Sequence, residues 1–218
     1  LINPLKTMTL VSYGTPTGEP ELARWADGDE PEESGTSHFV AVDKWGDAVS
    51  YTSTIEGPFG SGLMSGGFYL NNELTDFSLS PEKGGKPVAN RVQGAKRPRS
   101  SMSPTLVYDP KGNLLYALGA AGGTTIPTQV SKSLIALIDF KMPLEEALAL
   151  PQLFSPGDVV YLEQGTWLVD MADDLRSIGH EVAVREMPLK ANAVIRTKDG
   201  SNWHGAGDPR SEGVAISE

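Results

Sequence analysis

Alternating apolar and polar positions predict two β-hairpins in this chain. In the first, HFVAVD and AVSYTST (residues 38–43 and 48–54) are rich in β-branched and aromatic residues and enclose the turn DKWGD. The second is TLVYDPKGNLLYALGA, residues 105–120, which reverses direction around residues 110–112. The first half of the chain is therefore predicted to be mainly β-structure.

Turn chemistry sets the register of the first hairpin. A short loop at residues 44–46 suits a type I turn followed by a bulge, because Gly46 can adopt a positive φ without steric strain. This register pairs Asp43 with Asp47, so Thr36 falls opposite Thr54 on the same face. Two threonine hydroxyls are therefore expected side by side at the open end of the hairpin.

Helical periodicity begins after the second hairpin. Apolar positions repeat with helical spacing over residues 127–139 and 143–150, and a further helix in MADDLRSIGH is expected to end at Gly179. The later segments EVAVREM, NAVIRTKDG and SNWHGAGDPR are expected to add edge strands and a turn. Helices that cluster after a β-rich block favour an α+β fold over alternating βαβ units.

Residues 1–35 differ in composition from the rest of the chain. They contain four prolines, and the stretch ADGDEPEESG holds five acidic residues with almost nothing apolar. Such a run cannot bury enough apolar surface to offset the entropy of ordering. Residues 17–35 are therefore predicted to be a mobile tether, and residues 36–218 a separate folded domain.

Charge and composition exclude several classes of partner. The net charge of -10 and the pI near 4.8 argue against a nucleic-acid surface, since no basic stripe offsets the acid. No apolar run approaches the roughly 18 residues that a membrane helix needs. The absence of cysteine excludes disulfides and thiolate chemistry. None of this fixes the compartment, and both a periplasmic or secreted location and a cytoplasmic one remain open.

The histidines give no metal-site signature. His38, His180 and His204 are far apart in sequence and lack the i, i+4 spacing that places two imidazoles on one helical face. The expectation is that the protein binds no catalytic metal and no other cofactor.

Threonine chemistry is the remaining catalytic possibility. The motifs G-x-S-x-G, G-x-x-x-x-G-K-[ST] and H-E-x-x-H do not occur in the chain. A threonine hydroxyl is a poor nucleophile unless a base lies beside it, and an N-terminal amine can be that base. Cleavage between Gly35 and Thr36 would create such an amine. The simpler alternative is that Thr36 only begins a strand or caps a turn.

Three further segments could have functional or merely structural roles. Adjacent glycines in AAGGTT (residues 120–125) could direct backbone N–H groups at an oxyanion, and the paired serines of SSMSP (residues 100–104) could donate to a carboxylate. Both segments could equally be turns. In NNELTDF, Glu73 and Asp76 could form an acidic pocket or lie in a solvated loop.

Several long motifs in the same order resemble the small-subunit region of the γ-glutamyltranspeptidase family. They are TSHFVAVDKWGDAVSYTSTIEGPFGSG, GGFYLNNELTDFS, KRPRSSMSPT, GAAGG and GAGDPR, and they extend from Thr36 nearly to the C-terminus. The resemblance implies an N-terminal nucleophile hydrolase fold, an αββα sandwich with two antiparallel sheets, of which this chain is a part. Residues 1–35 would then be the tail of the large-subunit part of the precursor.

The resemblance also implies roles for the two threonines. Thr36 would be both the residue before which the precursor cleaves itself and the catalytic nucleophile, with its freed amine as general base. It would form an acyl-enzyme with a γ-glutamyl substrate, and water or an amine would then accept the acyl group. Thr54 matches the threonine that supports this hydroxyl and amine.

Matching positions imply how the substrate is held. Gly122 and Gly123 match the oxyanion hole, and Ser100 and Ser101 match the serines that bind the substrate α-carboxylate. The α-amino group would be bound by three acidic residues, Asp76 with Glu73 and Glu56. The large subunit of the same precursor would supply the other wall of the cleft and form a heterodimer after cleavage.

Two departures from the family pattern keep alternatives open. Glu56 stands where many members have asparagine, and the lid loop between Asp76 and Lys96 is short, which suggests an open cleft. Some divergent relatives act as cephalosporin (glutaryl) acylases. Three nearby carboxylates favour a substrate ammonium, which a glutaryl group lacks, so γ-glutamyl substrates are preferred. A third possibility is a non-catalytic isolated subunit fragment.

Overall fold

The computed structural model describes Ala26 and residues 35–217. The tether predicted for residues 17–35 and the proposed boundary of a 1–35 segment therefore lie mostly outside the described residues. Within the described part of the chain, no helix is long and apolar enough to cross a membrane.

The first hairpin has the predicted register. Strands β1 (Thr36–Val42) and β2 (Ala48–Thr54) are antiparallel, and Thr36 is the partner of Thr54. The backbone N–H of Asp43 donates to the carbonyl of Asp47 over 3.0 Å, and Gly46 has φ 90°. Alternate residues face inward along both strands, so both threonines share the partly buried face.

The second hairpin forms half of a four-stranded antiparallel sheet. Its strands are β7 (Thr105–Tyr108) and β8 (Leu114–Ala121), and the sheet order is β13-β12-β8-β7. Strands β12 (Lys190–Arg196) and β13 (Trp203–Gly207) come from the C-terminal part of the chain. The prediction that β12 is an edge strand is wrong, because β12 pairs with β8 on one side and with β13 on the other.

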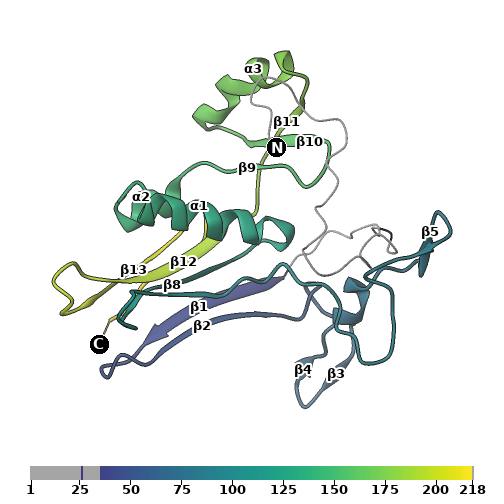
Figure 1. The fold of residues 1–218 in the computed structure, drawn as a ribbon. Coiled ribbons are helices and arrows are strands. Elements are labelled where there is room, and N and C mark those ends of the chain that lie inside the picture. Colours follow the sequence, from purple (N-terminus) through teal and green to yellow (C-terminus); the bar gives the residue numbers. More distant parts are fainter. Residues whose placement is uncertain (1–25, 27–34, 218) are drawn as a thin grey trace.

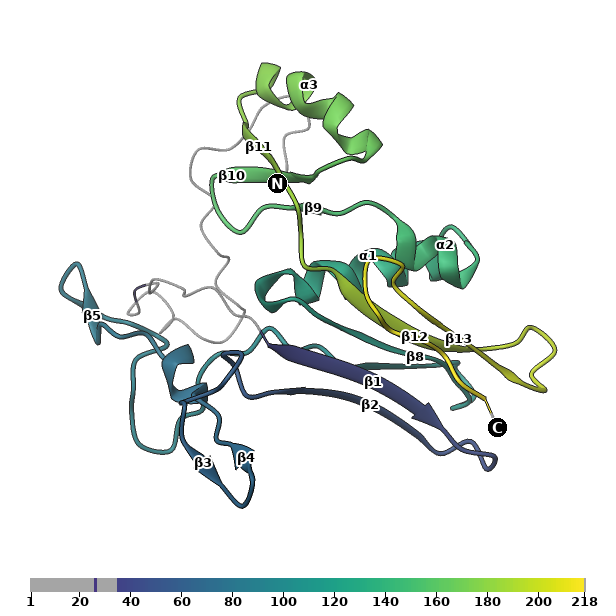
Figure 2. The same cartoon turned by 180° about the vertical axis from the view of Figure 1, so that it is seen from behind.

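Two helices cover one face of this sheet, and the first hairpin lies on the other (Figure 1, Figure 2). The helices are α1 (Ile126–Ile138) and α2 (Leu144–Ala149), close to the predicted ranges. The main core lies between the helices and the sheet. Its members are small and aliphatic side chains, including Leu118, Ala120, Ile126, Leu144, Leu148, Ala191 and Ala193. Hairpin, sheet and helices thus form three successive layers, ββα, of an αββα sandwich.

A third, smaller sheet was not predicted. It contains β9 (Leu153–Phe154), β10 (Val159–Glu163) and β11 (Glu181–Arg185), in the order β11-β10-β9. The chain passes from β10 through the 3-10 helix η4 (Trp167–Met171) and helix α3 (Ala172–Ser177) to β11, which pairs parallel to β10. As predicted, the helical segment ends near Gly179, which has φ 102°.

Short elements connect the first hairpin to the four-stranded sheet. They are β3 (Met64–Ser65), β4 (Phe68–Tyr69), the 3-10 helix η2 (Glu73–Asp76), β5 (Glu82–Lys83) and β6 (Lys86–Pro87). The pair β5–β6 lies in the short loop expected at the lid position, and it projects away from the layered body (Figure 1, Figure 2). Another 3-10 helix, η3 (Gly123–Thr125), leads from β8 into α1.

Candidate active site

The backbone before Thr36 adopts a conformation that requires glycine. Gly35 has φ 113°, and an added Cβ would lie 2.7 Å from the carbonyl oxygen of Glu56. The left-handed region and the lack of space both exclude an ordinary L side chain there. The Gly35–Thr36 junction is therefore pressed against the backbone that follows β2.

The end of β2 is fixed by a side-chain hydrogen bond. The backbone N–H of Glu56 donates to Thr54 Oγ1 over 2.8 Å. Thr54 is the register partner of Thr36, so the strand ends that carry the two threonines and the turn at Glu56 form one unit. Glu56 itself has φ 73°, a rare and strained conformation for a residue other than glycine.

Contacts along the hairpin show which end of the sheet Thr36 approaches. Ser50 Oγ donates to the carbonyl of Leu118 over 2.9 Å, and the His38 ring lies against Gly119. Towards the start of β1, the contacts on β8 therefore move forward from Leu118 to Gly119. Thr36, two residues before His38, therefore lies towards the end of β8 that is followed by Gly122.

The glycine pair forms a tight turn between β8 and α1. Gly122 has φ 129° and Gly123 has φ 58°, and an added Cβ on Gly122 would lie 2.3 Å from the carbonyl oxygen of Pro188. Thr125 Oγ1 closes the turn by donating to the carbonyl of Gly122 over 2.8 Å. Side chains are thus excluded from one side of the turn, as an exposed row of backbone N–H groups requires.

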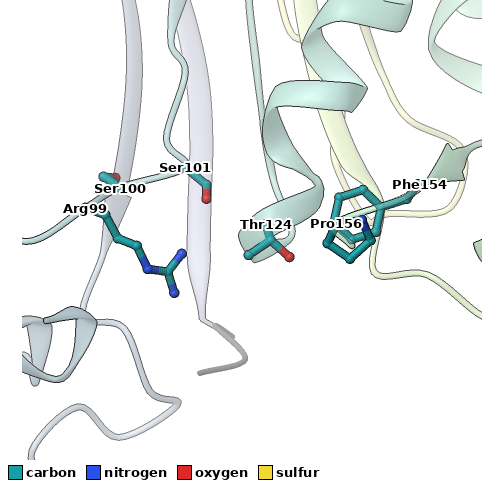
Figure 3. Close-up of a pocket in the computed structure, with 6 residues that line it drawn as sticks. All are labelled: Arg99, Ser100, Ser101, Thr124, Phe154 and Pro156. Carbon is teal, nitrogen blue, oxygen red and sulfur yellow. The ribbon is translucent and has the colours of Figure 1, made fainter. Parts of the chain in front are cut away.

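A cavity of about 340 Å³ joins the glycine turn to the serine pair. Figure 3 shows Arg99, Ser100 and Ser101 on one side of it and Thr124, Phe154 and Pro156 on the other. Thr124 directly follows Gly123 in the turn. The cavity therefore has hydroxyl and guanidinium groups facing the start of the helix across a space that fits a small molecule.

The predicted acidic residues form one cluster. Glu56 and Asp76 are 8% and 3% exposed. Asn72 links the cluster to the turn after β2, because its Nδ2 donates to Glu56 Oε2 over 2.6 Å and its Oδ1 accepts from the N–H of Gly57 over 2.8 Å. Within the described part of the chain, Asp76 Oδ1 is buried without a hydrogen-bond partner.

Burial and mutual repulsion raise the pKa of two of these carboxyls. For Glu73 the main cause is burial, followed by the charges of Asp76 and Glu56. Burial, then the charge of Glu56, raises the pKa of Asp76, and the guanidinium of Arg99 opposes this. Because these carboxylates are buried and repel one another, a nearby cation would stabilise their charged forms.

The structure places all of the predicted site residues in one region. The hairpin end carries Thr36 and Thr54, the acidic cluster adjoins it through Glu56, and Arg99 connects that cluster electrostatically to the serine-lined cavity. Sequence reasoning assigned no role to Asn72 or Arg99. Both lie inside the quoted motifs, which is the signal that could have singled them out.

Two of the histidines lie within hydrogen-bond distance of another side chain. His38 Nδ1 lies 2.8 Å from Thr52 Oγ1, and His204 Nε2 lies 2.7 Å from Glu145 Oε1. Among the described residues, no group of three or more His, Cys, Asp or Glu side chains could hold a metal ion.

Comparison with known proteins agrees with the resemblance of the motifs. The γ-glutamyltranspeptidase family profile matches residues 1–218. The chain belongs to this family. The glutathione hydrolase proenzyme of Bacillus subtilis strain 168 is 34% identical over 187 residues, which are 84% of this chain and 31% of that relative.

Solved structures of the γ-glutamyltranspeptidase family share the fold. The enzyme from Pseudomonas nitroreducens, complexed with L-DON, superposes with a TM-score of 0.72 at 34% identity, over 83% of this chain and 98% of that chain. The αββα N-terminal nucleophile hydrolase fold therefore holds for this protein. A cephalosporin acylase from Bacillus halodurans has a TM-score of 0.70 at 24% identity, which shows a common fold alone.

The chain spans 31% of the Bacillus relative, whose name describes a proenzyme. It thus corresponds to one part of that relative.

Proposed function

We propose that this chain carries the catalytic part of an autoprocessed γ-glutamyltransferase or glutathione hydrolase, with Thr36 as nucleophile. The observation that carries the proposal is the junction itself. A glycine in left-handed conformation precedes a threonine that starts a strand, and that threonine pairs with Thr54, whose hydroxyl is fixed by the N–H of Glu56. Membership of the family supports this assignment.

Autoprocessing would create the catalytic amine. Thr36 Oγ attacks the carbonyl carbon of Gly35, and the Gly35–Thr36 C–N bond breaks as the hydroxyl proton passes to the departing nitrogen. Water then hydrolyses the resulting ester, which leaves a carboxylate on Gly35 and a free amine on Thr36. Gly35 suits this junction, because it adopts the left-handed conformation without the strain that any other residue would carry there.

Turnover would use the new amine as general base. The amine takes the proton of Thr36 Oγ as the oxygen attacks the γ-carbonyl of the substrate, and it returns that proton to the departing nitrogen. The γ-glutamyl group is then held as an ester on Thr36. Water attacks this ester in hydrolysis and an amine attacks it in transfer. Each gives its proton to the same base, which passes a proton to Thr36 Oγ as the ester C–O bond breaks.

The neighbouring groups would bind the charged parts of the substrate. Backbone N–H groups of Gly122 and Gly123 face the oxyanion that forms on the γ-carbonyl, and the hydroxyls of Ser100 and Ser101 bind the α-carboxylate. Arg99, which lines the same cavity, adds positive charge for that carboxylate.

The acidic cluster favours a γ-glutamyl donor over a glutaryl donor. The buried, unpartnered oxygen of Asp76 is placed to accept from an ammonium, and Glu73 and Glu56 add negative charge. A glutaryl group would leave these charges uncompensated. Turnover of a γ-glutamyl anilide should therefore be faster than that of its glutaryl analogue, and the opposite order would favour the acylase alternative.

The remainder of the precursor would be the obligatory partner. After cleavage it would stay bound as the large subunit of a heterodimer and form the other wall of the cleft. Function should therefore be tested in the full-length precursor.

Intact-mass measurement of the full-length precursor tests the mechanism. We expect two fragments that meet between Gly35 and Thr36, and a single uncut, inactive chain for Thr36→Ala. Ser37→Ala is the matched control, because Ser37 is exposed on the outer face of β1 and should leave cleavage unchanged. An uncut wild-type precursor that turns over substrate would refute the mechanism, and one that is both uncut and inactive would support the non-catalytic alternative.

A further inference from the structure

A buried glutamine on α1 is hydrogen-bonded through both ends of its amide, at the glycine turn through Nε2 and at β12 through Oε1. Gln129 is 1% exposed. Its Nε2 donates to the carbonyl of Ala121 over 2.9 Å and to Thr125 Oγ1 over 2.8 Å, and its Oε1 accepts from the N–H of Lys190 over 3.0 Å. One side chain thus connects the last residue of β8, the turn that follows it and the first residue of β12.

The hydroxyl of Thr125 transmits this connection to Gly122. Thr125 Oγ1 accepts from Gln129 and donates to the carbonyl of Gly122, so its single proton is directed at that carbonyl. The Gly122 carbonyl belongs to the same peptide plane as the Gly123 N–H. Fixing the carbonyl therefore fixes the direction in which this N–H points.

Besides the hydroxyl, the backbone N–H of Thr125 donates to the Gly122 carbonyl over 3.3 Å, a longer hydrogen bond than the 2.8 Å one from Oγ1. Gly122 has no side chain and lies in a conformation that glycine adopts freely, so its own backbone sets no strong preference. Without the Gln129 amide, the Ala121 carbonyl and Thr125 Oγ1 would each lose a hydrogen bond in a buried position. The turn would then move to satisfy these groups. Oxyanion donors act through preorganisation, which such a movement removes.

We propose that Gln129 is a positioning residue that holds the N–H groups of Gly122 and Gly123 in the direction of the oxyanion. The inference rests on the function proposed above for these glycines. Gln129 acts through Thr125 and touches no substrate. Its effect should therefore appear in the stabilisation of the transition state and not in the binding of the ground state.

The first test replaces Gln129 by methionine in the full-length precursor. Gln129→Met keeps the length of the side chain and removes every amide hydrogen bond. Removal of a whole oxyanion donor lowers kcat by about 100- to 1000-fold. Misdirected donors should lower it by about 10- to 100-fold, with KM for a γ-glutamyl anilide within about twofold of wild type.

Inhibitor binding separates positioning from folding. A boronic acid analogue of the γ-glutamyl group forms a tetrahedral adduct with the nucleophile, and its affinity should fall by the same factor as kcat. The affinity of free glutamate, a ground-state ligand, should stay within about twofold. Equal losses for both ligands would overturn the proposal.

Ser133→Ala is the matched control. Ser133 lies one turn further along α1, is equally buried, and donates to the carbonyl of Gln129 over 2.9 Å. Its loss removes one buried hydrogen bond from the same helix without touching the glycine turn. We expect a lower Tm with kcat unchanged.

The pH dependence of Gln129→Glu provides a signature that a purely structural role lacks. A protonated carboxyl can still donate one hydrogen bond towards Ala121 or Thr125, whereas a carboxylate cannot. Activity of this variant relative to wild type should therefore recover as the pH is lowered. A relative activity that does not change with pH would contradict the proposal.

A milder variant keeps the test decisive if Gln129→Met does not fold. Thr125→Val removes only the hydroxyl that links Gln129 to Gly122 and should lower kcat by about 10-fold. An unchanged kcat in folded Thr125→Val would overturn the inference. A wild-type precursor without threonine-dependent turnover would instead refute the proposed function, so the two failures are distinguishable.

Discussion

One face of the four-stranded sheet packs on helices through aliphatic side chains, and the other packs on the β1–β2 hairpin through a mixture of polar and apolar ones. On the helical face, Leu118 and Ala120 of β8 meet Leu148 and other apolar residues. On the hairpin face, Asn192 Nδ2 donates to the carbonyl of His38 over 2.8 Å, and Gly119 leaves room for the His38 ring. Aliphatic packing is non-directional, whereas hydrogen bonds fix relative positions.

The difference assigns separate tasks to the two faces. Burial on the helical face should supply most of the stability of the fold. The hairpin face should contribute less to stability, but it fixes the strand that carries Thr36 relative to the glycine turn. Variants of the aliphatic residues on the helical face should therefore change the free energy of unfolding more than kcat, and variants on the hairpin face should do the reverse.

Loss of Arg210 should have the largest effect on stability. Its guanidinium binds Asp208 and Glu163, which are 1% and 7% exposed, and donates to the carbonyl of Leu148 at the end of α2. Arg210→Ala would remove the hydrogen-bonded cation of two buried carboxylates and leave them only the charge of nearby Lys132, so it should cost about 3–5 kcal/mol in the free energy of unfolding, measured by urea denaturation.

Arg176→Ala is the control for Arg210. The ion pair of Arg176 with Asp173 is exposed, and its loss should change stability by less than about 1 kcal/mol. The Arg210 variant should also regain stability as the pH is lowered, since protonation removes the unpaired charge. Equal losses of stability for Arg210→Ala and Arg176→Ala would show that the buried ion pairs of Arg210 stabilise the fold no more than an exposed ion pair does.

Leu148→Ala should cause the second-largest loss in the free energy of unfolding. Leu148 is fully buried between α2 and the sheet, and removal of such a side chain costs about 2–5 kcal/mol. Ile135, 50% exposed on α1, gives a matched Ile135→Ala control with a loss below about 1 kcal/mol. Well below its melting temperature, the Leu148 variant should keep the kcat of wild type, because the nucleophile strand is untouched. A matching loss of kcat would contradict the separation of tasks.

Gly119→Ala tests the hairpin face of the sheet, where the rate should change more than the stability. An added Cβ would lie 2.3 Å from Cε1 of the His38 ring, so the ring must move, and its contact with Thr52 Oγ1 should pass this movement to the hairpin. Such overpacking costs about 1–3 kcal/mol, less than Leu148→Ala at its upper limit. A displacement of about 1 Å at the nucleophile can lower the rate by about 100-fold. Steady-state kinetics on γ-glutamyl anilide should thus show a larger loss than for Leu148→Ala, and Gly94→Ala, with open space around it, should be neutral.

The hairpin register was predictable because its determinants are local. Asp43, Gly46 and Asp47 lie within one turn, and together they set the partner of every residue back to Thr36. The central position of β12 was not predictable in this way. Its pairing with β8 joins Ala191 to Ala120, which are distant in sequence, and a short apolar strand has the same pattern at an edge as in the interior.

The candidate site shows the same limit. The threonines, serines and glycines with proposed roles in chemistry were identified through ordered motifs, since their residue types suit the proposed reaction. Gln129 lies at an ordinary helical position, and its importance depends on Ala121 and Lys190 reaching it from two strands. Contacts of that kind exist only in the folded chain.

The smallest expected effect is on the pH dependence of stability, through His38 on the hairpin face. Burial lowers the pKa of His38 to about 4, while the unfolded chain should titrate near the ordinary value of about 6.5. Between these two values the unfolded state binds more protons than the folded state. The stabilising contribution is therefore complete above about pH 6.5 and is lost as the pH falls towards 4.

Replacement of His38 by glutamine tests this linkage. His38→Gln keeps a polar group beside Thr52 Oγ1 but cannot take up a proton. The stability advantage of wild type over the variant, measured by urea denaturation, should shrink between pH 7.5 and pH 5. The same comparison for Leu148→Ala should be constant across this range, because the helical face holds no titratable group at that position. Parallel pH curves for wild type and His38→Gln would mean that the imidazole is accessible to protons in the folded state, and the hairpin face would then be looser than its hydrogen bonds indicate.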